Sequence, residues 1–155
     1  MDKFHNKIMK KIVLIFLFFL ISCGYQPVYQ NKNIGSFEFS KIILSGNNDI
    51  NRKIIDTLSI KESKNNFNKL NIFSSYDVKI ASKDATGQAS TFKTAILVKL
   101  SIENTNDKSK GEKIFLKEFT YNNKEKKIEL VEYQNSIKND LINKIISEII
   151  IYLNS

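Results

Sequence analysis

The chain has 155 residues, enough for one compact domain and too few for two of ordinary size. It contains one histidine, His5, and one cysteine, Cys23, which excludes an intrachain disulfide and a zinc site built from several His and Cys ligands. Basic residues outnumber acidic ones by 24 to 16, but Arg52 is the sole arginine, and the lack of clustered arginine argues against nucleic acid as a partner.

The first segment has the pattern of an export signal. An unbroken apolar run, 12–21, follows four lysines, Lys3, Lys7, Lys10 and Lys11. A helix of that length rises about 15 Å, roughly half the hydrocarbon thickness of a bilayer, so the run is too short to span a membrane and fits a cleaved leader. A buried core segment is the alternative, which the lysine cluster disfavours. Met9 also has the pattern of a natural start, which would make residues 1–8 an upstream extension.

The apolar run ends in Leu20-Ile21-Ser22-Cys23, which resembles the lipobox of bacterial lipoproteins. The resemblance implies cleavage between Ser22 and Cys23, and a covalent diacylglycerol and N-acyl lipid on Cys23, with no other cofactor. Two or more acyl chains anchor a protein firmly, whereas one anchors it only marginally. Gly24 replaces the aspartate that favours retention in the inner membrane, so we expect the periplasmic leaflet of the outer membrane.

These patterns divide the chain into three parts. Residues 1–22 are the predicted lipoprotein signal peptide, and residues 23–35, with the only proline, Pro27, are a predicted lipid-anchored tether. Residues 36–155 are a predicted single domain. If Cys23 carries lipid, no thiol remains for a disulfide, and we expect this domain to be held together by its apolar core.

The domain opens with a strand–helix pattern. Residues 36–44 are β-branched and aromatic, which predicts a strand, and residues 45–49 predict a turn in which Asn48 or Asp49 caps a helix. Apolar side chains then recur every four residues through about Ile60, as expected for one helical stripe. Residues 61–71 are polar and weakly patterned, which indicates a frayed end or a loop.

Period-two alternation dominates the middle of the chain. It predicts strands over residues 76–81 and 92–103, separated by a turn at 84–90. After a loop at 104–111, residues 112–121 predict a further strand, whose register the pattern leaves open. These three strands would form an antiparallel meander.

The C-terminus predicts a long amphipathic helix over about residues 130–153. Its apolar stripe is Ile137, Leu141, Ile145, Ile149 and Leu153, widened by Ile142, Ile146 and Ile150. Charged and amide side chains on the other side exclude a transmembrane helix. Packing on the sheet is the simplest reading of the stripe, and a membrane-surface helix is the alternative.

Together the elements predict an α+β fold of two layers, in the order β-α-β-β-β-α. The four-stranded sheet would be mixed, because the strand–helix–strand crossover makes two strands parallel, and both helices would cover one face. The other face would carry Lys79, Lys93 and Lys99, and would be polar enough for water and flat enough for a partner.

The mature chain offers little for catalysis. Without histidine it has no imidazole base, and its scattered glycines form no phosphate-binding loop. A Ser–Lys dyad is the remaining catalytic option, and we expect a protein that is not an enzyme. For phosphate recognition the first candidates are Lys108, Lys110 and Lys113 around one loop, with solvated loop lysines as the alternative.

The segment Cys23-Gly24-Tyr25-Gln26-Pro27-Val28-Tyr29 is similar to the C-G-[FY]-x-P-[LV]-Y opening of LPS-assembly lipoproteins, the LptE-like family. That family has a four-stranded sheet packed by one helix after the first strand and another at the C-terminus. Tyr121-Asn122-Asn123 also looks like its strand end. The order of elements expected over residues 36–155 is the same. Cys23 is the one functional position that this resemblance transfers to the chain.

The resemblance implies a role in lipopolysaccharide (LPS) transport. Members plug the large outer-membrane β-barrel (LptD-like) that delivers LPS to the cell surface, assist its folding and contact LPS. An accessory lipoprotein of an ABC-type lipid transporter is the second hypothesis, and a small hydrolase is the third.

Overall fold

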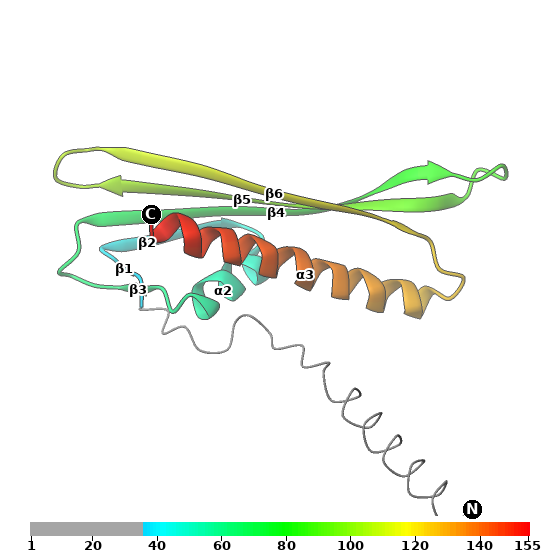
Figure 1. Ribbon diagram of the computed structural model, residues 1–155, viewed down its shortest axis with the longest axis horizontal. Coiled ribbons are helices and arrows are strands. Elements are labelled where there is room, and N and C mark those ends of the chain that lie inside the picture. Colours follow the sequence, from blue (N-terminus) through cyan, green and yellow to red (C-terminus); the bar gives the residue numbers. More distant parts are fainter. Residues whose placement is uncertain (1–35) are drawn as a thin grey trace, which may run out of the picture. The chain divides into compact units, whose positions relative to one another are not determined.

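The computed structural model describes residues 36–155, which form an α+β domain (Figure 1). The predicted signal peptide, the cleavage position at Ser22 and Cys23, and the tether lie outside the described residues. In chain order the elements are β1 (Glu38–Phe39), β2 (Lys41–Gly46), α2 (Asn48–Thr57), β3 (Lys61–Glu62), β4 (Asn68–Lys83), β5 (Ala89–Asn104), β6 (Lys110–Asn122) and α3 (Lys127–Leu153).

The main sheet has four strands in the order β2-β4-β5-β6. β2 runs parallel to β4, whereas the pairs β4–β5 and β5–β6 are antiparallel, so the predicted mixed sheet and element order are confirmed. A two-residue parallel pair, β1–β3, lies outside this sheet and was not predicted. It splits the strand predicted over 36–44 at Ser40, whose backbone N–H and hydroxyl both donate to the carbonyl of Asn68.

The segment predicted as a loop over 61–71 contains β3 and the first residues of β4. The polar side chains of this segment give no strand pattern, because its strand residues are held by backbone hydrogen bonds. The Lys61 N–H donates to the Phe37 carbonyl, and the Ser63 N–H donates to the Phe39 carbonyl. Leu70 is fully buried although polar residues flank it. β4 therefore begins at Asn68, eight residues before the alternation that announced it.

Both helices pack on one face of the sheet, which gives the predicted two layers (Figure 1). The even-numbered residues of β4 and β5 point into the core, where Leu70, Ile72, Ile96 and Val98 are fully buried. From α3, the buried side chains are those of the predicted apolar stripe: Ile137, Leu141, Ile142, Ile145, Ile146 and Ile149. Among the described residues, no helix is long and apolar enough to cross a membrane.

α2 begins one position earlier than the sequence predicts. The cap is Asn47, and not Asn48 or Asp49: its side-chain oxygen accepts from the Ile50 N–H at 3.1 Å. All three residues can cap a helix, but Asn47 is the one whose N–H is also held by the sheet, through the Ser74 carbonyl at 2.9 Å. The sheet contact therefore decides which of them becomes the cap.

The β4–β5 turn is organised by the Asp84 carboxylate. One of its oxygens accepts from the Thr86 hydroxyl at 2.7 Å and from the N–H groups of Thr86 and Gln88. These hydrogen bonds, the one from the Thr86 hydroxyl foremost, hold the pKa of Asp84 below its ordinary value of 3.8. Because the folded pKa is the lower one, the contribution of the carboxylate to stability is present above the ordinary pKa and is lost as pH falls through the lowered pKa.

We therefore expect the carboxyl of Asp84 to titrate with a midpoint below 3.8 in a carbon-detected NMR titration. In a Thr86→Val variant, which removes the hydroxyl and keeps the N–H, the midpoint should move back toward 3.8. A midpoint of 3.8 or higher in the unsubstituted protein would contradict this account of the turn.

Candidate functional site

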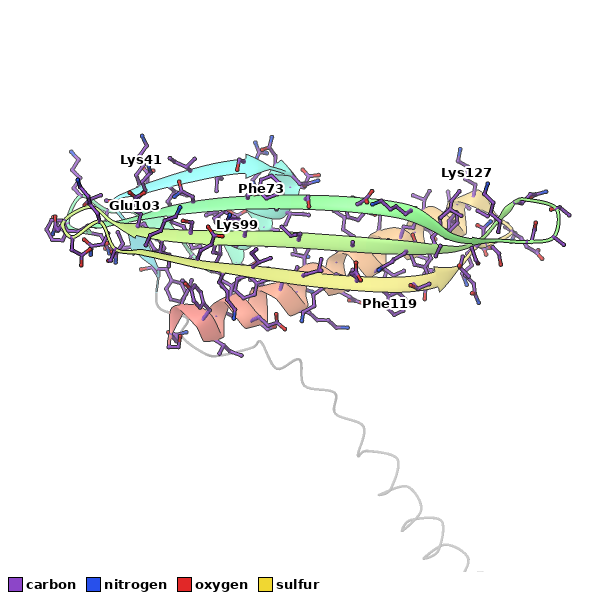
Figure 2. The ribbon with its side chains drawn as sticks, turned by 90° about the horizontal axis from the view of Figure 1, so that it is seen from above. Lys41, Phe73, Lys99, Glu103, Phe119 and Lys127 are labelled. Carbon is purple, nitrogen blue, oxygen red and sulfur yellow. The ribbon has the colours of Figure 1, made fainter. Side chains whose placement is uncertain are left out.

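The candidate site is the face of the sheet that no helix covers, which we call the open face (Figure 2). It is formed by the odd-numbered residues of β4 and β5 and the even-numbered residues of β6, because partners in the ladder point to the same side. Lys79, Lys93 and Lys99 lie on it, as predicted from the alternation. The open face is therefore the surface on which the domain can meet a partner without disturbing its core.

Each of the three open-face lysines has a carboxylate partner. Lys93 contacts Glu118 at 2.7 Å and Lys99 contacts Glu112 at 2.8 Å, both across the β5–β6 ladder. The Lys79 ammonium donates to the Asp77 carboxylate at 2.9 Å, and this hydrogen bond raises the pKa of the lysine. Exposed pairs of this kind contribute little to stability. Their main effect is to neutralise the charges of these three lysines on the open face.

Large apolar side chains lie between these ion pairs. Phe73 on β4 is 42% exposed, and Ile114 and Leu116 on β6 are 53% and 51% exposed. The ladder places Phe73 and Ile114 on either side of Lys99, and it places Leu116 beside Leu97. Sequence reasoning missed this cluster because residues 112–119 carry apolar side chains at both odd and even positions. Pairing with β5 decides which ones face outward.

One polar atom on the open face lacks a partner. The hydroxyl of Ser101 is buried, and the side chain is only 7% exposed. No hydrogen bond reaches it from any of the described residues. The ladder places it between Asn71 and Glu112. An unmet hydroxyl of this kind costs about 1–3 kcal/mol. Because the oxygen itself is buried, we assign it no role in binding.

The three lysines predicted as phosphate ligands do not converge on one site. Lys108 lies in the β5–β6 loop with a left-handed backbone, at φ 59°. Lys110 pairs with Glu103 on the open face, whereas Lys113 pairs with Leu100 and points to the helix side. Alternation along β6 separates them, because residues an odd number apart face opposite sides. Among the described residues, no group of acidic residues, histidine or cysteine could hold a metal ion.

Aromatic residues gather on the helix side of the sheet, at the end near the β4–β5 turn. Tyr121 stacks on Phe92 at 5.9 Å between ring centroids and meets Tyr133 of α3 edge-on at 5.7 Å. The Thr94 hydroxyl donates to Tyr121 at 3.2 Å, and burial raises the pKa of the neighbouring Tyr76. These contacts fix the first half of α3 on the sheet. Because Tyr121 is buried and contacts both the sheet and α3, we assign this cluster a packing role.

Comparisons with known proteins show the fold and no family. No protein-family model and no curated protein matches the sequence. The crystal structure of rare lipoprotein B from Shewanella oneidensis is similar, with a TM-score of 0.59 at 11% identity over 74% of this chain and 93% of that one. The solution structure of uncharacterized lipoprotein B from Nitrosomonas europaea gives a TM-score of 0.53 at 10% identity, over 82% and 88%. The domain thus has a fold that is found in bacterial lipoproteins.

Proposed function

We propose that the protein is a non-enzymatic, lipid-anchored subunit of the outer membrane that assists LPS assembly by occupying the lumen of an LPS-translocating β-barrel, helping it fold and contacting LPS. Three features support this: the lipobox ending at Cys23, the opening Cys23–Tyr29, and a fold shared with rare lipoprotein B. The observation that carries the proposal is the open face.

The chemistry of the open face suits the inside wall of a barrel. The lumen of such barrels is polar, so a partner seated there needs a surface that is neither strongly charged nor uniformly apolar. Paired charges around Lys93 and Lys99 and apolar side chains at Phe73 and Leu116 provide that mixture. β4 and β5 each have 16 residues, so they extend over about 50 Å at the usual rise per residue, long enough to contact a barrel wall along its height.

The runner-up is an accessory lipoprotein of an ABC-type lipid transporter, which would share the anchor and the fold. The two differ in partners, so purification of the full-length lipidated protein from membranes, followed by mass spectrometry, separates them. We expect a large β-barrel protein to be recovered. Recovery of substrate-binding and permease subunits would favour the runner-up, and recovery of neither would contradict both.

A substitution on the open face should weaken the complex. We expect Phe73→Glu to reduce the recovered barrel by about tenfold, because it replaces an apolar contact with a charged side chain. Phe67→Glu is the matched control: Phe67 is 56% exposed in the loop before β4, away from the open-face ladder. Equal recovery of the barrel with both variants would show that the open face is not part of the interface.

A further inference from the structure

β6 has a free backbone edge. The Asn123 N–H donates to the Ser90 carbonyl and the Asn104 N–H to the Ser109 carbonyl, and both pairs keep the register of the β5–β6 ladder. In an antiparallel pair, hydrogen-bonded positions alternate, so the odd residues of β6 bond to β5. The even residues, including Ile114 and Leu116, direct their N–H and C=O groups away from the sheet. No hydrogen bond from the described residues occupies these groups.

The opposite edge of the sheet is guarded. β2 has six residues against thirteen in β6. The Glu62 carboxylate accepts from the Ile42 N–H at 2.8 Å, so it occupies a donor on that edge. Short edge strands and charged side chains prevent other chains from pairing with a sheet edge, whereas a long edge with apolar side chains invites it. Of the two sheet edges, therefore, β6 is open to an added strand and β2 is protected from one.

α3 forms a ledge along the free edge. It crosses the sheet diagonally, so its C-terminal end lies beyond β6 when the sheet is viewed from above (Figure 2). Between ledge and edge is a groove of about 540 Å³. Ile151 on the ledge is 68% exposed, and Ile114 and Leu116 on the strand are more than half exposed. The lining residues are Lys113, Ile114, Phe115, Leu116, Glu148, Ile151, Tyr152 and Ser155.

The charge of Lys113 in the groove sets a second requirement for a bound segment, besides the apolar lining. Lys117 is paired with Glu148 across the space between β6 and α3, so that lysine is already neutralised. Lys113 lines the groove, and no carboxylate of residues 36–155 forms an ion pair with it. A guest with an acidic side chain at that end would neutralise Lys113. Its apolar side chains would meet Ile114, Leu116 and Ile151.

We propose that this groove accepts an extended segment of a partner polypeptide, which adds to β6 as a fifth strand through main-chain hydrogen bonds. The side chains of the segment that point to the open side are apolar, beside Ile114 and Leu116, and those that point to the helix side include an apolar one beside Ile151 and an acidic one opposite Lys113. A second copy of this chain does not suit the groove, because its own α3 would project beyond its β6 edge and the two ledges would meet on the same side. This inference rests on the proposed function only for the source of the segment, which we assign to the barrel protein.

The direct test uses the full-length protein and a labelled synthetic peptide that has valine on both sides of the strand and one aspartate among the residues on the side of Lys113. We expect the peptide to bind, and we expect its version with alternate backbone nitrogens methylated to lose binding, since methylation removes the main-chain donors. Ile151→Lys should weaken binding by at least about tenfold. Ile128→Lys is the matched control on the same helix, because Ile128 is 69% exposed and lies at its other end.

A backbone variant separates strand addition from apolar contact. Leu116→Pro removes an outward N–H from the edge and leaves the bonds to β5 in place, so the fold should persist and the peptide should bind at least about tenfold more weakly than to Leu116→Ala, the control that removes the leucine side chain and keeps the N–H. Unchanged binding by Leu116→Pro, or equal binding of the methylated peptide, overturns the proposal. So does self-association of the protein that Leu116→Pro abolishes, and so does unchanged peptide binding by Ile151→Lys.

The source of the segment is tested in cells with a photo-crosslinking residue at Ile151, which lines the groove, and, as a control, at Ile128 near the other end of α3; neither position is on the open face. Crosslinks from position 151 to an extended segment of the barrel protein, absent from position 128, support the assignment. A barrel that co-purifies without crosslinking at 151 leaves the proposed function standing and overturns this inference. Peptide binding by a protein that recovers no barrel contradicts the proposed function and leaves strand addition to β6 standing.

Discussion

Replacing Gly46 with alanine is expected to destabilise the domain by roughly 3 kcal/mol or more. Gly46 ends β2 with φ +82°, a left-handed conformation that costs an L-residue about 1–2 kcal/mol. In addition, a Cβ at Gly46 would overlap the backbone carbonyl oxygen of Ser74 on β4. Backbone cannot move aside as a side-chain end can, so relieving the overlap requires a shift of β2 against β4, typically at a further 1–3 kcal/mol. Urea unfolding followed by circular dichroism measures the loss.

Gly87→Ala is the matched control for this prediction. Gly87 lies in the β4–β5 turn with nearly the same backbone angle, φ +84°, but nothing lies within 4 Å of an added Cβ. We expect it to cost only the conformational part, about 1–2 kcal/mol. The difference between the two variants isolates the contact with Ser74, and equal losses would mean that the contact is relieved without cost.

Replacing Asn51 with leucine is expected to cost about 3 kcal/mol. Asn51 is fully buried on α2, where its Nδ2 donates to the Ser45 carbonyl at 2.8 Å and its Oδ1 accepts from the Ser74 hydroxyl at 2.7 Å. Leucine has a similar volume but removes both hydrogen bonds, and a buried polar group left without a partner costs about 1–3 kcal/mol. The same unfolding measurement, at constant denaturant slope, gives the change.

A double-mutant cycle tests the mechanism of this loss. In Asn51→Leu the Ser74 hydroxyl loses its Asn51 acceptor and keeps only the Asn47 carbonyl, at 3.0 Å. Adding Ser74→Ala should therefore cost less in that background than in the unsubstituted protein, with a coupling of about 1 kcal/mol or more. Asn143→Leu, an exposed change on α3, should stay within about 0.5 kcal/mol. Additive losses from the first two substitutions would contradict the pairing of Asn51 with Ser74.

These two positions matter for function because they hold α2 against the helix side of the sheet. Gly46 allows the chain to turn from β2 directly over β4, and Asn51 then ties the first turns of α2 to both strands. With α2 and α3 both on that side, the open face stays free of helices (Figure 1). The surface that carries the proposed function is therefore a consequence of a few buried polar contacts on the opposite side.

The sequence by itself determined the α+β class, the order of the main elements and the packing face of α3. Apolar residues repeat with a clear period in 92–103 and 137–153. Such a period shows which side of a strand or helix is buried, and it can be recognised from neighbouring residues alone. The same logic placed Lys79, Lys93 and Lys99 on the open face. The family resemblance and the lipobox depend on residues 20–29, outside the described residues, and stay predictions.

Only the tertiary structure decided the register of β6, the strand residues within 61–71 and the cap at Asn47. Each depends on a partner far away in the chain: β5 for β6, Phe37 and Phe39 for β3, and Ser74 for Asn47. The partners of the open-face lysines and the free edge beside α3 follow from those pairings. Local periodicity contains no information about which strand lies next to which, because long-range pairing is selected by burial and hydrogen bonding of the whole domain.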